Sequence, residues 1–293
     1  MLNEEQVNFY AENGFLAVEG VFSPEEVARA REVVDELVEQ SRSVTVHTDV
    51  YDLEPTHSPE HPRVRRLKAP LSTHPYFEHL ARKDALLDVV AGLLGSAIRL
   101  HGNKLNMKAA EYGSAVEWHQ DFAFYPHTND DLLAVGIAID DCLPENGCML
   151  MVPGSHRWPI LNHHQEGYFV GAIDAEREGI DLSAAVPVPV HAGGITLHHC
   201  RTLHGSAPNT SSRPRRLFLL ELAAVDAWPC MGVPDLAAFD ARIWRGSPTA
   251  SYRVTNMDIR PPLPKHERQG SIYEVQTPLR AKLFAAGKVA PTT

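Results

Sequence analysis

The chain has 293 residues, of which 44% are hydrophobic and 22% charged, and its formal net charge is −10 at pH 7. This composition suits a globular protein with ample core material, and the acidic balance disfavours binding to nucleic acid or to an anionic membrane surface. No run approaches the roughly 18 apolar residues of a membrane span, and the polar N-terminus is no signal peptide. Four cysteines without a Cys-x-x-Cys pair favour a reducing cytoplasm.

Helical patterns dominate the first third of the chain. Asn3 can cap a short helix that stops at Gly14, and Phe15 to Val18 is then typical of a strand. Ser23-Pro24-Glu25-Glu26 combines an N-cap with a capping-box glutamate, and the residues behind it form one apolar helical stripe. The sequence from Pro75 to Leu94 also has helical periodicity, and Gly95 marks its end.

Between these helices, Val44 to Pro75 is irregular and rich in proline and histidine. It contains His47-Thr48-Asp49, one of two His-x-Asp triplets in the chain, which we interpret as part of a loop and not as a metal site.

After Gly95 the sequence changes to short strand-like runs separated by turn residues. The predicted strands are Ile98–His101, Lys104–Ala109, Leu132–Ile139, Cys148–Val152, Val186–Val190, Ile195–His199 and Arg216–Leu222. Because helices precede the strands and do not alternate with them, a parallel α/β sheet is disfavoured. We predict a mainly β fold with N-terminal helices, namely a double-stranded β-helix (jelly-roll, cupin-like). One domain should span 1–293, with a helical part at 1–95, a jelly-roll core at 96–225 and a C-terminal extension at 226–293.

The second His-x-Asp triplet is the candidate metal site. If it lies in a strand, His119 and Asp121 point to the same face. The 2-His-1-carboxylate triad of non-haem Fe(II) oxygenases needs one more histidine, and His204 suits this role because it follows the strand Ile195–His199. Arg215 opens the strand after His204, and its planar guanidinium matches a dicarboxylate.

Three further motifs accompany His119 and Asp121: Glu145-Asn146-Gly147-Cys148, Val152-Pro153-Gly154-Ser155-His156, and His204-Gly205-Ser206 with Asn209 and Arg215. Together they resemble the phytanoyl-CoA dioxygenase superfamily of Fe(II)- and 2-oxoglutarate-dependent oxygenases. The resemblance covers roughly Gly14 to Leu222 in the family's order. It implies that His119, Asp121 and His204 hold iron, that Arg215 and Ser206 bind 2-oxoglutarate, and that Asn106 contacts this co-substrate, as in related ectoine hydroxylases.

The resemblance further implies that O2 and 2-oxoglutarate are consumed to hydroxylate a small molecule, with release of succinate and CO2. Asp121 favours hydroxylation or desaturation over halogenation, because related halogenases lack this carboxylate. Ala123-Phe124-Tyr125-Pro126 departs from the ectoine-type continuation, and the chain has no basic cluster for the phosphates of an acyl-CoA. A metal-binding cupin-type barrel without oxidative chemistry is the alternative, but it would not need Arg215 and Asn106.

Substrate choice is predicted to lie in segments outside the barrel, chiefly Val44–Pro75 and Phe124–Asp130, with His156–Phe169 as a third. The candidate substrate residues are Lys104, Trp118, Phe124, Tyr125 and His127. We interpret the remaining strand histidines, His191, His198 and His199, as structural. The oligomeric state and the identity of the substrate do not follow from the sequence.

Overall fold

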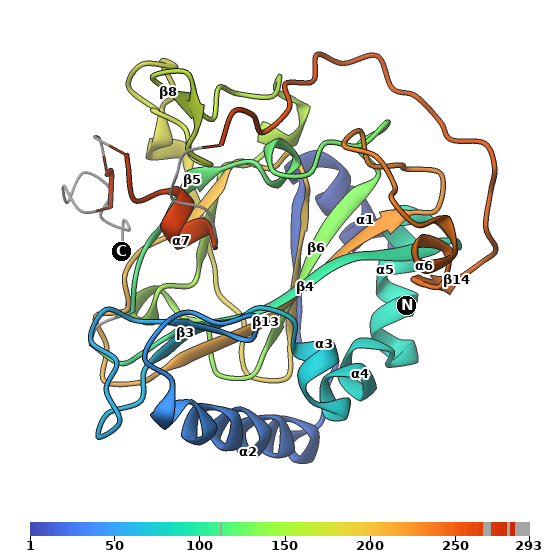
Figure 1. Cartoon of the computed structure of the whole chain (residues 1–293). Coiled ribbons are helices and arrows are strands. Elements are labelled where there is room, and N and C mark those ends of the chain that lie inside the picture. Colours follow the sequence, from blue (N-terminus) through green and yellow to red (C-terminus); the bar gives the residue numbers. More distant parts are fainter. Residues whose placement is uncertain (112, 266–270, 280–281, 285–293) are drawn as a thin grey trace.

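The structure is a computed structural model that describes residues 1–111, 113–265, 271–279 and 282–284 (Figure 1). Its helices are α1 (Glu4–Asn13), α2 (Pro24–Gln40), α3 (Pro70–Thr73), α4 (Pro75–Ala81), α5 (Asp84–Leu94), α6 (Leu236–Asp240) and α7 (Ile272–Val275). Within the described ranges, no helix is both long and apolar enough to cross a membrane.

The strands form two main antiparallel sheets, as the jelly-roll prediction requires. The larger sheet has the order β1-β11-β6-β13-β4-β3-β2, with β14 added to β4, and the smaller one has the order β10-β7-β12-β5. These strands are β1 (Phe15–Val18), β2 (Tyr51–Leu53), β3 (Val64–Leu67), β4 (Ile98–Lys108), β5 (Val116–His119), β6 (Leu132–Ala138), β7 (Met149–Met151), β10 (Val186–Val188), β11 (Ile195–His199), β12 (His204–Ser206), β13 (Arg215–Ala224) and β14 (Ile243–Arg245). The short strands β8 (His164–Gln165) and β9 (Tyr168–Phe169) form a separate hairpin.

The N-terminal helices cover the outer face of the larger sheet. In Figure 1, α2 runs below the strands β3, β4 and β13. The main hydrophobic core lies in this layer, where Val33 and Val34 of α2 join Leu105 of β4 and Phe218 of β13, all fully buried. Burial of such side chains contributes about 1.5–3 kcal/mol each. The opposite face of the sheet is therefore free to line the inside of the barrel.

The predicted caps of the first two helices are confirmed. The Asn3 side chain accepts a hydrogen bond from the backbone N–H of Gln6, and the Ser23 side chain accepts one from that of Glu26. The predicted helix from Pro75 to Leu94 is instead two helices, because the chain leaves helical geometry at Arg82 and Lys83.

The segment Val44–Pro75 is not only a loop, which corrects the prediction. It contains β2 and β3, which extend the larger sheet beyond β4. Their alternation was hidden by charged residues, because Asp52, Arg65 and Arg66 lie within the strands and are partly or fully buried there.

Helix α7 bridges the two sheets at the side where β2 and β5 form their edges (Figure 1). Glu274 pairs with His47 at 2.8 Å and with Arg65 at 3.5 Å, on the side of the larger sheet. On the other side, Gln276 exchanges hydrogen bonds with the backbone of Glu117 in β5. The seam between the sheets is thus closed by residues far from the barrel in sequence.

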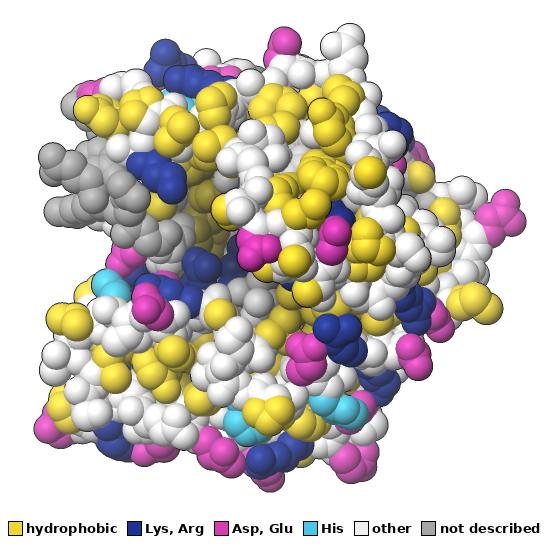
Figure 2. All heavy atoms as spheres, turned by 45° about the vertical axis from the view of Figure 1, so that its right-hand side comes forward, with side chains coloured by type: hydrophobic (Ala, Val, Ile, Leu, Met, Phe, Trp, Pro, Cys, Tyr) yellow, Lys and Arg dark blue, Asp and Glu magenta, His cyan; other side chains and the backbone are white. Residues whose placement is uncertain are grey.

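The surface is uneven in charge. Figure 2 shows a deep hollow in one face of the molecule, with Lys and Arg side chains inside it and hydrophobic side chains on both sides.

Candidate active site

Two histidines meet at neighbouring strands of the smaller sheet. His119 ends β5, His204 begins β12, and the two residues are paired in the sheet register. Each ring donates its Nδ1–H to a backbone carbonyl, that of Glu117 at 2.8 Å and that of Thr202 at 2.9 Å. Such a bond fixes the tautomer, so that Nε2 of each ring carries a free lone pair suited to a metal.

Asp121 follows at the end of the strand and not within it. It begins a short 3-10 turn, Asp121–Ala123, so the same-face argument from strand alternation was wrong, although the side chain does return to His119. One carboxylate oxygen, Oδ1, lies 3.6 Å from His119 Nε2, while Oδ2 accepts a hydrogen bond from His198 Nε2 at 3.1 Å. One ligand atom from each of His119, Asp121 and His204 lies within 4.8 Å of the others.

The protonation states of these groups suit a divalent cation. Burial alone would raise the pKa of Asp121, but the nearby ring of His119 and the hydrogen bond from His198 hold that pKa well below its usual value. Burial lowers the pKa of His204, and the neighbouring rings of His119 and His198 lower it further. One buried carboxylate beside two imidazoles is the donor set of the Fe(II) facial triad, and three protein ligands leave positions open.

A cavity of about 510 Å³, including space open to solvent, extends from these three residues into the barrel. Arg215, Ser206 and Asn106 line it together with the triad. Within the described chain, three residues that line it have a buried polar atom without a hydrogen-bond partner: the Nε of Arg215, the Oδ1 of Asn106 and the Nδ1 of His198. Unpartnered buried polar groups are costly, and the N–H at Nε of Arg215 is a donor that a ligand carboxylate matches, whereas Oδ1 of Asn106 needs a donor.

Motif residues fix the position of these groups. Gly147 has φ +79°, and a Cβ at this position would lie 2.5 Å from the carbonyl oxygen of Ala207. The carbonyl of Gly147 accepts a hydrogen bond from Arg215 at 3.0 Å. Ser155 Oγ accepts the N–H of Leu203, directly before His204, at 2.8 Å. Asn209 donates to the carbonyls of Lys108 and Arg213, which ties the turn that leads into β13.

The candidate substrate residues divide between three places. Lys104 lines the cavity of the triad. Phe124, Tyr125 and His127 line a second cavity, which residues of the C-terminal extension and of α6 complete. Trp118 lines neither cavity; it is fully buried on the other face of β5 and stacks on Phe284 with ring centroids 5.7 Å apart. Of the fully described segment 44–75, no residue lines either cavity.

His198 and Ile272 line the cavity but were not predicted to do so. His198, interpreted as structural, is buried, lines the cavity and contacts Asp121. Strand alternation could have indicated that His198 faces the cavity. Ile195 and Leu197 belong to the core on the helix side, so Thr196 and His198 face the barrel. Ile272 of α7 also lines the cavity, and no local pattern could place it there.

Other clusters of histidine are structural. His163 Nε2 accepts the N–H of Gln120 at 2.9 Å, which excludes it as a ligand in this arrangement. His47 lies near Asp52 and Glu274. However, its Nδ1 accepts the N–H of Leu53 at 3.1 Å, so its Nε2 carries the proton that faces Glu274. This cluster is an ion-pair network and not a metal site.

Comparison with known proteins agrees with this geometry. Residues 10–217 match the family model described as phytanoyl-CoA dioxygenase (PhyH). A probable alpha-ketoglutarate-dependent hypophosphite dioxygenase of Stutzerimonas stutzeri is 35% identical over 96% of this chain and 99% of its own length. An ectoine dioxygenase of Sphingopyxis alaskensis is 24% identical over 76% of each chain.

Solved structures share the fold. The non-haem alpha-ketoglutarate-dependent carbocyclase SnoK from nogalamycin biosynthesis has a TM-score of 0.61 at 25% identity, over 85% of this chain and 94% of its own. The ectoine dioxygenase EctD from S. alaskensis with bound Fe has a TM-score of 0.66 at 24% identity, over 89% of each chain. This chain therefore belongs to the phytanoyl-CoA dioxygenase family and is an Fe(II)- and 2-oxoglutarate-dependent dioxygenase.

Proposed function

We propose that His119, Asp121 and His204 hold the Fe(II) of this dioxygenase and that Arg215, Ser206 and Asn106 bind 2-oxoglutarate. The observation that carries this proposal is the convergence of the three ligand atoms, all within 4.8 Å of one another, in the cavity that Arg215 also lines. A non-oxidative metal-binding barrel would not require a buried guanidinium in the cavity of the metal ligands.

Each group has a defined task in this proposal. Bound Fe(II), with 2-oxoglutarate and O2, supplies the oxidation of a substrate bond coupled to the release of succinate and CO2. Arg215 offers its planar fork to the distal carboxylate of 2-oxoglutarate, and Ser206 and Asn106 contribute hydrogen bonds. The apolar side chains of Leu217, Leu219 and Ile272 line the same cavity and exclude water from the reacting groups.

The substrate is a small molecule that approaches from the iron end of the cavity. Phe124 supports this direction, because its ring packs edge-on against His119 with centroids 5.6 Å apart while it also lines the second cavity. Selection by Lys104, Phe124, Tyr125 and His127 and by the outer segments stays a prediction, as does the cytoplasmic location. Hypophosphite, the substrate in the name of the 35% identical relative, is the first compound to test.

An anaerobic Fe(II) titration tests the metal assignment. We expect one equivalent of Fe(II) to bind to the wild type, and His119→Ala and His204→Ala each to abolish tight binding, because two ligands cannot replace three. His163→Ala is the matched control, since this buried histidine serves the backbone of Gln120. If both ligand variants keep full iron affinity, the triad is wrong. If they lose iron but the wild type shows no 2-oxoglutarate turnover with any candidate, the non-oxidative barrel is favoured.

A further inference from the structure

Two cations line the cavity of the triad, and they lie at different levels of the barrel. Arg215 stands opposite Lys108 in the register of β13 and β4, whereas Lys104 stands opposite Leu219. Four strand residues at about 3.3 Å each separate these levels by roughly 13 Å. Given the proposed function, on which this inference rests, 2-oxoglutarate uses one carboxylate at Arg215 and the other at the metal. Lys104 is then left without a counter-ion from the co-substrate.

The ammonium group of Lys104 forms an ion pair with Glu221. Its Nζ lies 2.7 Å from Oε1 of Glu221, and the two side chains are 19% and 13% exposed. Lys104 lines the cavity but Glu221 does not. An ammonium has three donors, and in the described part of the chain Glu221 is its one hydrogen-bond partner. Two donors therefore remain for a ligand on the cavity side.

Glu221 stands opposite Gly102 in the register of β13 and β4. Its room comes from Gly102, because a Cβ at that position would lie 2.2 Å from Oε2 of Glu221. Burial would raise the pKa of Glu221, but the charge of Lys104 and the nearby His101 keep it below its usual value, so the carboxylate stays ionised. Lys104 and Asp121 line the same cavity.

We propose that the substrate is a compact oxyanion bound by Lys104, and that Glu221 is the residue that positions Lys104 for it. An anion in this enclosed site needs a charged partner, because desolvation of an unpaired charge is costly. Lys104 supplies that partner at the iron end of the cavity, where the substrate has to lie. A compact oxyanion offers acceptors to the two remaining donors of Lys104 without bringing a second cationic group close to that ammonium, as a zwitterion would.

The test uses the full chain loaded with Fe(II) and 2-oxoglutarate. It compares two oxyanions, hypophosphite and acetate, with the zwitterions ectoine and L-proline. Succinate release gives KM and kcat, and anaerobic changes in visible absorption give the anion dissociation constant. We expect an oxyanion to stimulate succinate release. Lys104→Met should raise its KM and dissociation constant by about tenfold to a hundredfold, with the KM for 2-oxoglutarate unchanged.

Two further variants separate charge from fold. Lys104→Arg keeps the positive charge and should retain most of the affinity for the anion. Glu221→Gln should raise the KM for the anion with little change in kcat, as expected for a residue that acts through Lys104. Arg29→Met is the control, because it removes a cation from an exposed pair on α2 whose side chains are 44% and 63% exposed.

The proposal is overturned if no oxyanion binds to or stimulates the loaded enzyme, or if a zwitterion alone does so. It is also overturned if Lys104→Met leaves the anion's KM and dissociation constant unchanged. Binding of Fe(II) and 2-oxoglutarate by the wild type in the same experiment distinguishes these results from failure of the proposed function, in which the co-substrate itself would not bind.

Discussion

His198 donates from Nε2 to Oδ2 of Asp121 at 3.1 Å, which leaves Oδ1 facing His119. A carboxylate held in this way offers a metal one oxygen in a fixed direction. Loss of an outer partner of a metal ligand typically costs about 10–100-fold in affinity. We therefore expect His198→Phe to weaken Fe(II) binding by that factor in an anaerobic titration, while the unfolding midpoint of the apoprotein changes little.

The neighbouring histidine provides the matched control for this prediction. His199 lies on the other face of β11 and approaches Asp130 instead, at 4.0 Å. His199→Phe should keep the wild-type affinity for Fe(II). Equal losses in the two variants would mean that the packing of β11, and not the hydrogen bond to Asp121, controls the metal site.

Arg215 and Arg216 are adjacent residues with opposite roles. Arg215 is buried in the cavity, whereas Arg216 points to the other face and binds Asp140. A hydrogen bond to a charged group contributes about 1.5–3 kcal/mol, so Arg215→Leu should weaken 2-oxoglutarate by roughly tenfold to several hundredfold and leave Fe(II) bound. Titration of the iron-loaded enzyme with 2-oxoglutarate measures this change. Unchanged affinity in Arg215→Leu, or the same loss in Arg216→Leu, would contradict the assignment.

Much of the site follows from local patterns at this scale. His119, Asp121, His204, Ser206 and Arg215 stand at strand ends or turns whose motifs can be read in the sequence, and they share one cavity. Trp118 could also have been assigned correctly, because a strand that turns His119 inward must turn its neighbour outward. The ion pair of Lys104 with Glu221 could not, since its 117-residue separation is bridged only by the pairing of β4 with β13.

Helix α7 is the element that local patterns predict least and that the cavity depends on most. Gln276, just after it, accepts the N–H of Glu117 at 3.0 Å and donates to the carbonyls of Glu117 and Gly171. These bonds hold Ile272 against the cavity. Gln276→Ala should therefore loosen the seam between the sheets and raise the KM for 2-oxoglutarate by about 3- to 30-fold, as expected from the loss of one or two net hydrogen bonds.

Thr277→Ala is the control for this element, because the Thr277 hydroxyl bonds only to the carbonyl of Tyr273 within the same turn among the described contacts. It should change neither the KM for 2-oxoglutarate nor the affinity for Fe(II). If Gln276→Ala also leaves the KM unchanged, α7 is a passive cover.

Elements with strong periodicity were predicted well, and those stabilised by distant partners were not. The helix behind Ser23 and the strand Ile195–His199 have the predicted bounds or nearly so. The predicted strands Ile98–His101 and Lys104–Ala109 are one continuous strand, β4, because pairing with β13 carries the chain through Gly102 and Asn103. Likewise β3 pairs with β4, and Arg65 of β3 forms an ion pair with Glu274 of α7, and neither partner is indicated by a local pattern.

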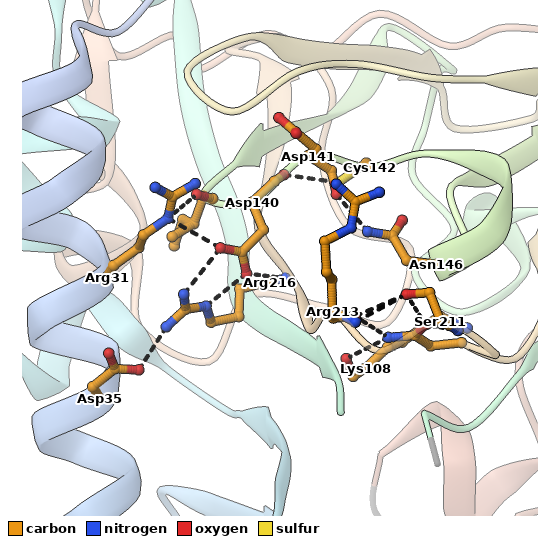
Figure 3. A network of polar contacts seen from close by, with 12 residues as sticks. Arg31, Asp35, Lys108, Asp140, Asp141, Cys142, Asn146, Ser211, Arg213 and Arg216 are labelled. Atoms are coloured by element: carbon orange, nitrogen blue, oxygen red, sulfur yellow. Dashed lines mark hydrogen bonds and ion pairs between the residues drawn. The ribbon is translucent and has the colours of Figure 1, made fainter. Parts of the chain in front are cut away.

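At the scale of the whole molecule, a partly buried ionic network joins the helical layer to the barrel (Figure 3). Arg216 of β13 contacts Asp140 through Nε at 2.7 Å and Nη2 at 2.9 Å, and it reaches Asp35 of α2 at 2.6 Å. Arg31 of α2 binds the same Asp140 at 3.1 Å. Asp140 thus connects a helix near the N-terminus with a barrel strand almost two hundred residues later.

Asp140→Asn should destabilise the protein as a whole, because it removes the charge that two arginines share. Asp140 and Arg216 are each only 12% exposed in their side chains, so water replaces little of the lost interaction. Arg216 keeps Asp35 as a partner, so we expect the loss of hydrogen bonds to a charged group, about 1.5–3 kcal/mol in the free energy of unfolding, measured by urea denaturation. Glu32→Gln, in the exposed pair with Arg29, is the control and should cost less than about 1 kcal/mol. Similar values for the two variants would mean that apolar packing alone holds α2 on the sheet.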